Sequence, residues 1–118
     1  MEPLEAYFRI REACLRRPEL KYKDGYVFDG EKDEEYFKNN RYMGFCYVAT
    51  FAFCNLVDGA IPYTTKDKTH YWAQIEDKIW DLTAEQFNFI YPYNEGRKVP
   101  RKKPTKRTQL LLEETLER

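Results

Sequence analysis

The sequence has a single histidine, only three cysteines, and no apolar run as long as the roughly 18 residues that a membrane-spanning helix needs. Its first ten residues, MEPLEAYFRI, include acids where a secretory signal peptide would carry only basic charge. We therefore expect a cytoplasmic protein without a membrane segment. There is no internal repeat, and the only stretch of biased composition is the basic segment 97–107.

The few cysteines limit the chemistry that they can support. Positions 14, 46 and 54 leave at least one thiol unpaired and show no CxxC spacing. If Cys46 and Cys54 share a helix, they lie roughly 12 Å apart, too far for a disulfide. A zinc site of Cys14, Cys46, Cys54 and His70 has enough ligands, but it lacks the paired close spacings of structural zinc sites. We expect free thiols, with no metal and no cofactor.

Composition otherwise indicates one folded domain. The 118 residues suffice for one domain and are too few for two, and ten Tyr and eight Phe supply large apolar surfaces. The net charge of zero is uneven: residues 1–96 hold 12 Lys+Arg against 17 Asp+Glu, and residues 97–118 hold 8 against 3. The basic tail could contact phosphate, an acidic partner, or the acidic face of its own domain.

Apolar periodicity predicts three helices. The first spans 3–17, with Pro3 near its start; its predicted buried residues are Leu4, Tyr7, Phe8, Cys14 and Leu15. The second spans 45–57, is apolar nearly throughout, and places Cys46 in its first turn and Gly59 in a left-handed position after its end. The last follows Thr105 and offers Leu110, Leu111, Leu112 and Leu116 for packing. We divide the chain into a helix with a variable region (1–40), a core (41–96), and a basic connector with a helix (97–118).

Two alternating segments predict a pair of antiparallel strands. THYWAQI and KIWDLT flank the dipeptide Glu76-Asp77, which is typical of a tight turn. After them, Thr83 and Gln86 form a capping-box pattern that begins a helical turn. Residues 91–104 are predicted to be an extended connector.

Cys46, His70 and Asp81 are candidates for a nucleophilic site. A catalytic cysteine must react as the thiolate, and the start of a helix supplies a positive field and unpaired N–H groups that can bind an oxyanion. His70 could accept the thiol proton, and Asp81 could orient its ring from the other nitrogen.

The hairpin register decides whether this site can form. With a two-residue turn at Glu76-Asp77, Asp81 falls opposite Trp72, on the face of His70 and diagonal to it. With a three-residue loop, Asp81 points to the other face. Each residue also has a structural interpretation: a core cysteine, a histidine that begins a strand, and an aspartate that supports the next helix.

The segments GFCYVAT, HYWAQI, WDLTAEQF and TKRTQLLLEETLE resemble the YunG-like proteins, small bacterial and phage proteins grouped with papain-like and transglutaminase-like cysteine hydrolases. The resemblance covers the chain from about Tyr42 onward. It implies an α+β fold with a papain-like or transglutaminase-like core, in which a cysteine-bearing helix packs on a small antiparallel sheet. By motif position, it makes Cys46 the nucleophile, His70 the base and Asp81 the residue that orients the base.

The resemblance and the aromatic residues around the predicted site supply further candidates. Phe45 stands where this family has a glutamine, so a side-chain oxyanion donor is missing at that position. Asn40 lies where papain-like enzymes place their oxyanion amide. Tyr42 and Trp72 could hold a peptide or planar ligand, whereas Trp80 is expected in the core, and Gln86 is a further candidate for substrate contact.

These observations lead to a cysteine-dependent hydrolase or acyl transferase acting on a peptide or protein amide. The alternative is an inactive binding or inhibitor protein on the same fold, gripping a host protein with its uneven charge. A third reading is nucleic-acid binding through the cations of the tail, and it is opposed by the overall neutrality. Those cations are Arg97, Lys98, Arg101, Lys102, Lys103, Lys106 and Arg107.

Overall fold

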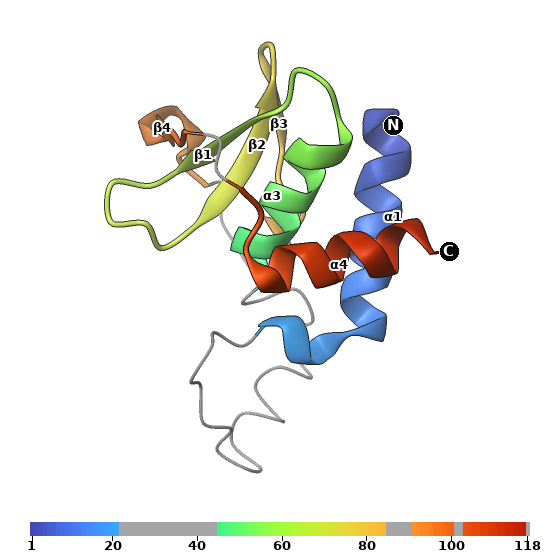
Figure 1. Ribbon diagram of the computed structural model, residues 1–118. Coiled ribbons are helices and arrows are strands. Elements are labelled where there is room, and N and C mark those ends of the chain that lie inside the picture. The colour runs from blue at the N-terminus through green and yellow to red at the C-terminus, as the bar shows by residue number, and fades with distance from the viewer. Residues whose placement is uncertain (22–44, 85–90, 101–102, 118) are drawn as a thin grey trace.

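The computed structural model describes residues 1–21, 45–84, 91–100 and 103–117. Their helices are α1 (Pro3–Arg16), α3 (Cys46–Leu56) and α4 (Lys106–Leu116), with two short 3₁₀ turns, η1 (Pro18–Lys21) and η3 (Tyr93–Glu95). Their strands are β1 (Ile61–Thr64), β2 (Tyr71–Ile75), β3 (Lys78–Trp80) and β4 (Arg97–Lys98). The described residues thus have the predicted α+β architecture with an antiparallel sheet (Figure 1).

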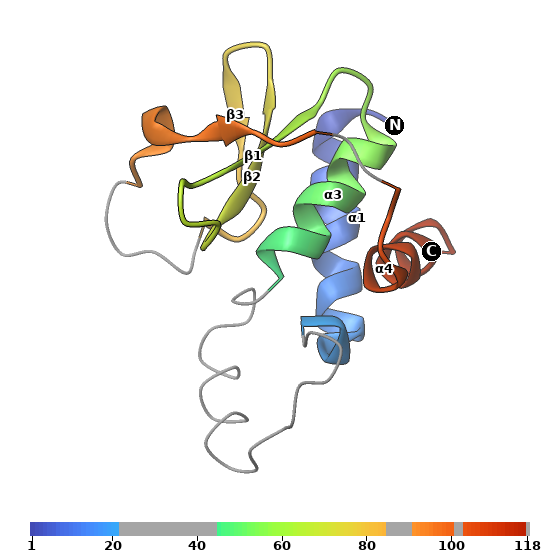
Figure 2. The same cartoon turned by 60° about the vertical axis from the view of Figure 1, so that its left-hand side comes forward.

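Helix α3 is the centre of the fold and lies between the sheet and the two other α-helices (Figures 1 and 2). Every residue from Val48 to Cys54 is buried, which explains why the sequence is apolar around the whole helix. The predicted helix over 45–57 is confirmed, and Cys46 is its first residue.

Gly59 turns the chain from α3 into β1. Its φ of +83° lies in the left-handed region, as predicted, and the Ala60 N–H closes the turn onto the Val57 carbonyl oxygen at 3.3 Å. The sheet therefore starts directly beside the helix that it covers.

Helix α1 is confirmed, but the prediction of its buried face is wrong. Leu4, Phe8 and Leu15 are exposed by 59%, 54% and 45%. Of the five predicted residues, only Cys14 is buried, and Tyr7 is partly buried. The buried stripe is made of Ala6, Ile10, Ala13 and Cys14. These mostly small residues let α1 approach both α3 and α4 closely, so packing selected the less apolar of two stripes.

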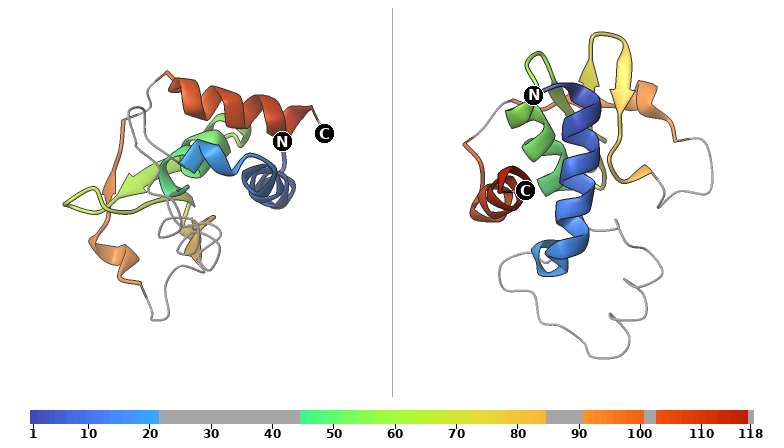
Figure 3. Two further views of the ribbon diagram at one scale, coloured as in Figure 1. Left: turned by 90° about the horizontal axis from the view of Figure 1, so that it is seen from below. Right: turned by 90° about the vertical axis from the view of Figure 1, so that its right-hand side faces the viewer.

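Helix α4 packs across α1 (Figure 3) and begins with Thr105, whose side chain accepts a hydrogen bond from the Thr108 N–H. Leu111 is fully buried, whereas Leu116 is 55% exposed, contrary to the prediction. Arg16 Nε donates to Glu114 Oε1 at 2.9 Å and so joins α1 to α4. The basic tail is therefore part of the fold.

The sheet has the order β3-β2-β1-β4, and all its neighbouring strands are antiparallel. Strand β4 pairs with β1, with Arg97 opposite Thr64 and Lys98 opposite Tyr63. The prediction of a plain extended connector over 91–104 is thus wrong, because part of it forms η3 and the fourth strand. No helix within the described ranges is long and apolar enough to cross a membrane.

Candidate active site

Cys46 stands at the N-terminal end of α3, where the helix meets the sheet. The preceding residue, Phe45, is fully buried and its carbonyl oxygen accepts the Ala49 N–H at 2.8 Å, which anchors the first turn. Cys46 itself is partly exposed, whereas Cys14 and Cys54 are buried in the core. Only Cys46 therefore combines access with the unpaired N–H groups of a helix start.

His70 precedes β2 and is held from its backbone. Its carbonyl oxygen accepts hydrogen bonds from Thr64 Oγ1 at 2.8 Å and from the Thr65 N–H at 3.3 Å. Its side chain is buried, with the whole residue 2% exposed. The pairing of β1 with β2 thus fixes where the ring can lie.

Asp81 follows β3 and reaches His70 across the hairpin. Ile75 pairs with Lys78, so Glu76 and Asp77 form the two-residue turn, and the first of the two registers considered above is the observed one. Asp81 Oδ2 lies 2.7 Å from His70 Nε2. The diagonal contact expected from that register is present.

Two further residues hold the Asp81 carboxylate. Thr83 donates to Oδ1 from its N–H at 3.1 Å and from its hydroxyl at 3.4 Å, and the Tyr93 hydroxyl donates to Oδ2 at 2.6 Å. These donors fix the carboxylate plane against His70. Burial and the hydrogen bond to Asp81 also raise the pKa of Tyr93 well above its ordinary value, so Tyr93 stays a donor.

The electrostatics of the site favour a protonated imidazole. Burial by itself lowers the pKa of His70, but hydrogen bonds and charge interactions with Asp81 and Cys46 outweigh it and raise the pKa from 6.5 to about 9. Because Nε2 faces Asp81, Nδ1 is the nitrogen left for Cys46. His70 therefore bridges the acid and the thiol.

Aromatic rings enclose the imidazole. Trp72 stacks beside His70 with a centroid distance of 5.8 Å, and Tyr91 meets the imidazole edge-on at 5.0 Å. Trp72 is fully buried, so this candidate for substrate contact packs behind the histidine instead of lining an open surface. A Cβ at Gly96 would overlap the Trp72 ring, which shows how closely the segment before β4 closes over it.

Sequence reasoning missed the contributions of Tyr91 and Tyr93. Both lie in the segment predicted as a connector, and only the long-range pairing of β4 with β1 brings them to His70 and Asp81. The one available signal is the pair of tyrosines in Tyr91-Pro92-Tyr93. Three other predicted site residues, Asn40, Tyr42 and Gln86, lie outside the described residues.

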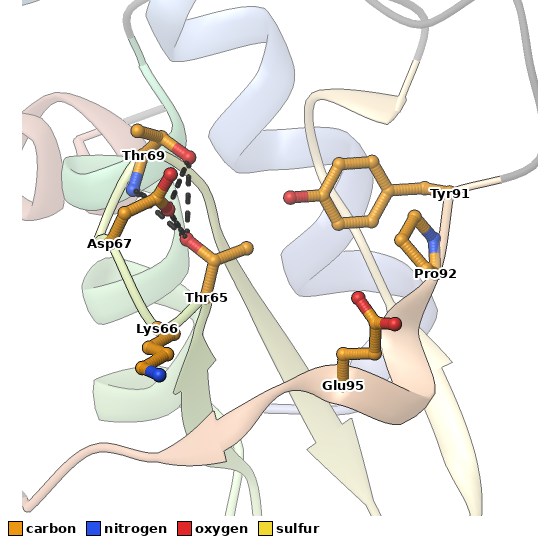
Figure 4. Close-up of a pocket in the computed structure, with 7 residues that line it drawn as sticks. All are labelled: Thr65, Lys66, Asp67, Thr69, Tyr91, Pro92 and Glu95. Carbon is orange, nitrogen blue, oxygen red and sulfur yellow. Dashed lines mark hydrogen bonds between the residues drawn. The ribbon is translucent and has the colours of Figure 1, made fainter.

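A cavity of about 710 Å³ opens beside the site (Figure 4). Thr65, Lys66, Asp67 and Thr69 form one wall, and Tyr91, Pro92 and Glu95 form the other. Tyr91, which also touches His70, connects this cavity to the imidazole. In the described part of the chain, no three His, Cys, Asp or Glu side chains gather closely enough to hold a metal ion.

The fold and the site together define a small α+β protein in which a helix start and a hairpin bring a cysteine, a histidine and an aspartate together. The family model described as YunG protein matches residues 26–118, so this chain belongs to the YunG family. The match begins at residue 26 and is therefore longer than the resemblance from Tyr42 suggested. Comparison with curated proteins and with solved structures found no match.

Proposed function

We propose that this protein is a cysteine-dependent hydrolase or acyl transferase that uses Cys46, His70 and Asp81, in the manner of papain-like and transglutaminase-like enzymes. The observation that carries the proposal is the buried His70 ring, hydrogen-bonded to Asp81 on one side and interacting with a partly exposed helix-start cysteine on the other. A purely structural histidine does not require a cysteine at this position.

The proposed reaction begins from a Cys46 thiolate beside the protonated His70 imidazole, because the pKa of His70 is raised to about 9. The thiolate attacks the carbonyl carbon of an amide or thioester, and N–H groups of the first turn of α3 receive the negative oxygen. When the tetrahedral intermediate collapses, the imidazolium gives its proton to the leaving amine or thiolate, and an acyl group remains on sulfur. Water or an acceptor amine then attacks the thioester carbon while His70 takes its proton. Collapse of this second tetrahedral intermediate breaks the carbon–sulfur bond, releases the acyl product and restores the thiolate beside the protonated His70.

The site favours backbone donors for the oxyanion. Phe45, which stands in place of the expected glutamine, is an apolar core residue and offers no side-chain donor. Asn40 remains a proposed second donor. Asp81, held by Thr83 and Tyr93, keeps the imidazole oriented through each proton transfer.

Acyl-enzyme trapping tests the proposal. The protein is mixed with p-nitrophenyl acetate near neutral pH, and its mass is followed with time by intact mass spectrometry. We expect an acetyl group that forms on Cys46 and then clears. Cys46→Ser and His70→Ala should both lack this cycle, while Cys54→Ala, which changes a buried thiol of the same helix, should keep it.

Two outcomes would contradict the proposal. One is acylation of all three cysteines at similar rates in the wild-type protein. The other is a folded His70→Ala variant, shown by circular dichroism, that acylates and clears as fast as wild type. The first result favours a binding protein that uses this fold without turnover, and the second would show that acylation and clearance do not depend on His70.

A further inference from the structure

A second, smaller cavity adjoins the site and is lined by cations. It has a volume of about 220 Å³, and Lys66, Lys68, Arg97 and Lys98 contribute to its wall together with Tyr47 and Tyr71. No acidic residue lines it, and none of the four cations pairs with a carboxylate in the part of the chain that is described. We propose that this cavity binds an anionic group, carboxylate or phosphate, of the substrate whose acyl carbon Cys46 attacks; the inference rests on the proposed function.

The sheet topology gathers these charges from two distant segments. Arg97 and Lys98 form β4 and pair with Thr64 and Tyr63 at the end of β1. Lys66 and Lys68 lie in the loop that leaves that same end of β1. Residues about thirty positions apart in sequence therefore face one cavity, which a basic run along the tail alone would not produce.

The cavity lies next to the reacting groups. Tyr47 lies in the first turn of α3 directly after Cys46, and its ring meets that of Tyr71 edge-on at 5.0 Å. Burial raises the pKa of Tyr71, with a smaller contribution from Cys46, so the phenol stays protonated beside the anion. An anionic group in this cavity would therefore lie close to a carbonyl presented to Cys46.

The one acid of the loop 65–69, Asp67, is hydrogen-bonded within the loop and does not line the cationic cavity. Asp67 accepts hydrogen bonds from the Thr65 and Thr69 hydroxyls at 2.7 and 2.8 Å and lines the larger cavity, which Thr65 and Lys66 also line (Figure 4). Lys68 adopts φ 60°, a left-handed conformation that glycine adopts more readily. Its N–H donates to the Thr65 carbonyl oxygen at 3.0 Å, which holds the turn. This turn places Lys68 on the wall of the cavity.

Paired alkylating agents test the proposal without a known substrate. Iodoacetate is anionic and iodoacetamide is neutral, and both alkylate the same sulfur, so their rate ratio at Cys46 reports the local preference for an anion. Because His70 also attracts anions, the informative comparison is between variants that keep His70. The test variant is Lys68→Gln with Arg97→Gln, and the matched control is Lys78→Gln, an exposed lysine beside the hairpin turn at the far end of β2 from His70.

We expect the double variant to lower the iodoacetate rate by about threefold or more at low salt, with the iodoacetamide rate unchanged. Lys78→Gln should leave both rates as in wild type, and added salt should reduce the difference between wild type and the double variant. A rate ratio that is the same in the double variant and in wild type would overturn the proposal.

Protection experiments identify the anion. If inorganic phosphate alone slows alkylation of Cys46 by iodoacetamide, the cavity accepts a phosphoryl group; if acetate alone does, it accepts a carboxylate. Protection by neither overturns the proposal. The proposed function fails separately if Cys46 reacts with iodoacetamide near neutral pH no faster than free cysteine. The ratio of the iodoacetate rate to the iodoacetamide rate can still be measured at higher pH, so the two failures are distinguishable.

Discussion

At the scale of single residues, the Asp81 carboxylate is held by three neighbouring side chains. Its Oδ2 is hydrogen-bonded to both the His70 ring and the Tyr93 hydroxyl, and its Oδ1 accepts a hydrogen bond from the Thr83 N–H. Hydrogen bonds to a charged group are stronger than neutral ones, and the loss of one donor from a buried carboxylate is costly. Tyr93 is therefore a positioning residue that acts through Asp81.

We expect Tyr93→Phe to lower the free energy of unfolding by about 1–3 kcal/mol, because it deletes a donor to a buried carboxylate and keeps the ring. Urea denaturation measures the change. Tyr63→Phe is the matched control, since the Tyr63 ring also stacks on Trp72 but its hydroxyl makes no hydrogen bond within the described residues. Equal destabilisation by the two variants would show that the bond to Asp81 contributes nothing.

At the scale of elements, the β2–β3 hairpin determines whether Asp81 faces His70. Its two-residue turn contains Glu76 at φ 54°, in the left-handed region, so the register is held by a turn whose first central residue is not the preferred glycine. Insertion of one residue here would move Asp81 to the other face of the sheet. The register of this hairpin therefore determines whether Asp81 can contact His70.

Glu76→Gly should raise the free energy of unfolding by about 0.5–1 kcal/mol, because glycine relieves the left-handed penalty by more than it adds chain entropy to the unfolded state. Asp77→Gly is the control: its φ is not positive, so it should instead be destabilising by a similar amount. Thermal or urea unfolding gives the sign, and a destabilised Glu76→Gly variant would contradict this view of the turn.

The elements also show what the sequence can and cannot predict. Helix α3, the hairpin and α4 follow from local periodicity and turn residues. These elements were enough to locate Cys46 at a helix start and His70 before a strand. The prediction of the buried stripe of α1 was wrong, because the stripe that is buried depends on the elements against which the helix packs. Strand β4 and its neighbour Tyr93 were missed because a two-residue strand carries no local pattern and forms only by pairing with β1.

At the scale of the whole molecule, the site joins the two layers of the fold. Cys46 comes from the central helix, while His70 and Asp81 come from the sheet packed on it. The His70–Asp81 pair is buried, so its protonation is linked to folding.

This linkage predicts a pH-dependent stability. The folded-state pKa of His70, about 9, exceeds the unfolded value of 6.5, so the contribution of the pair is fully present below about pH 6.5 and is lost as pH rises through 9. We expect wild type to lose up to about 3 kcal/mol relative to His70→Gln over this window, by urea denaturation at several pH values. The comparison with His70→Gln removes the titration of tyrosines and other cysteines, and parallel curves would contradict the raised pKa.

The most direct test of the central claim is the alkylation rate of each thiol against pH, read site by site by mass spectrometry. The Cys46–His70–Asp81 arrangement predicts that Cys46 reacts near neutral pH faster than the buried Cys14 and Cys54, and that His70→Ala slows it by about tenfold or more. If Cys46 instead follows the pH dependence of an ordinary thiol, with a midpoint about 8.5, in both proteins, the three residues do not form a nucleophilic site.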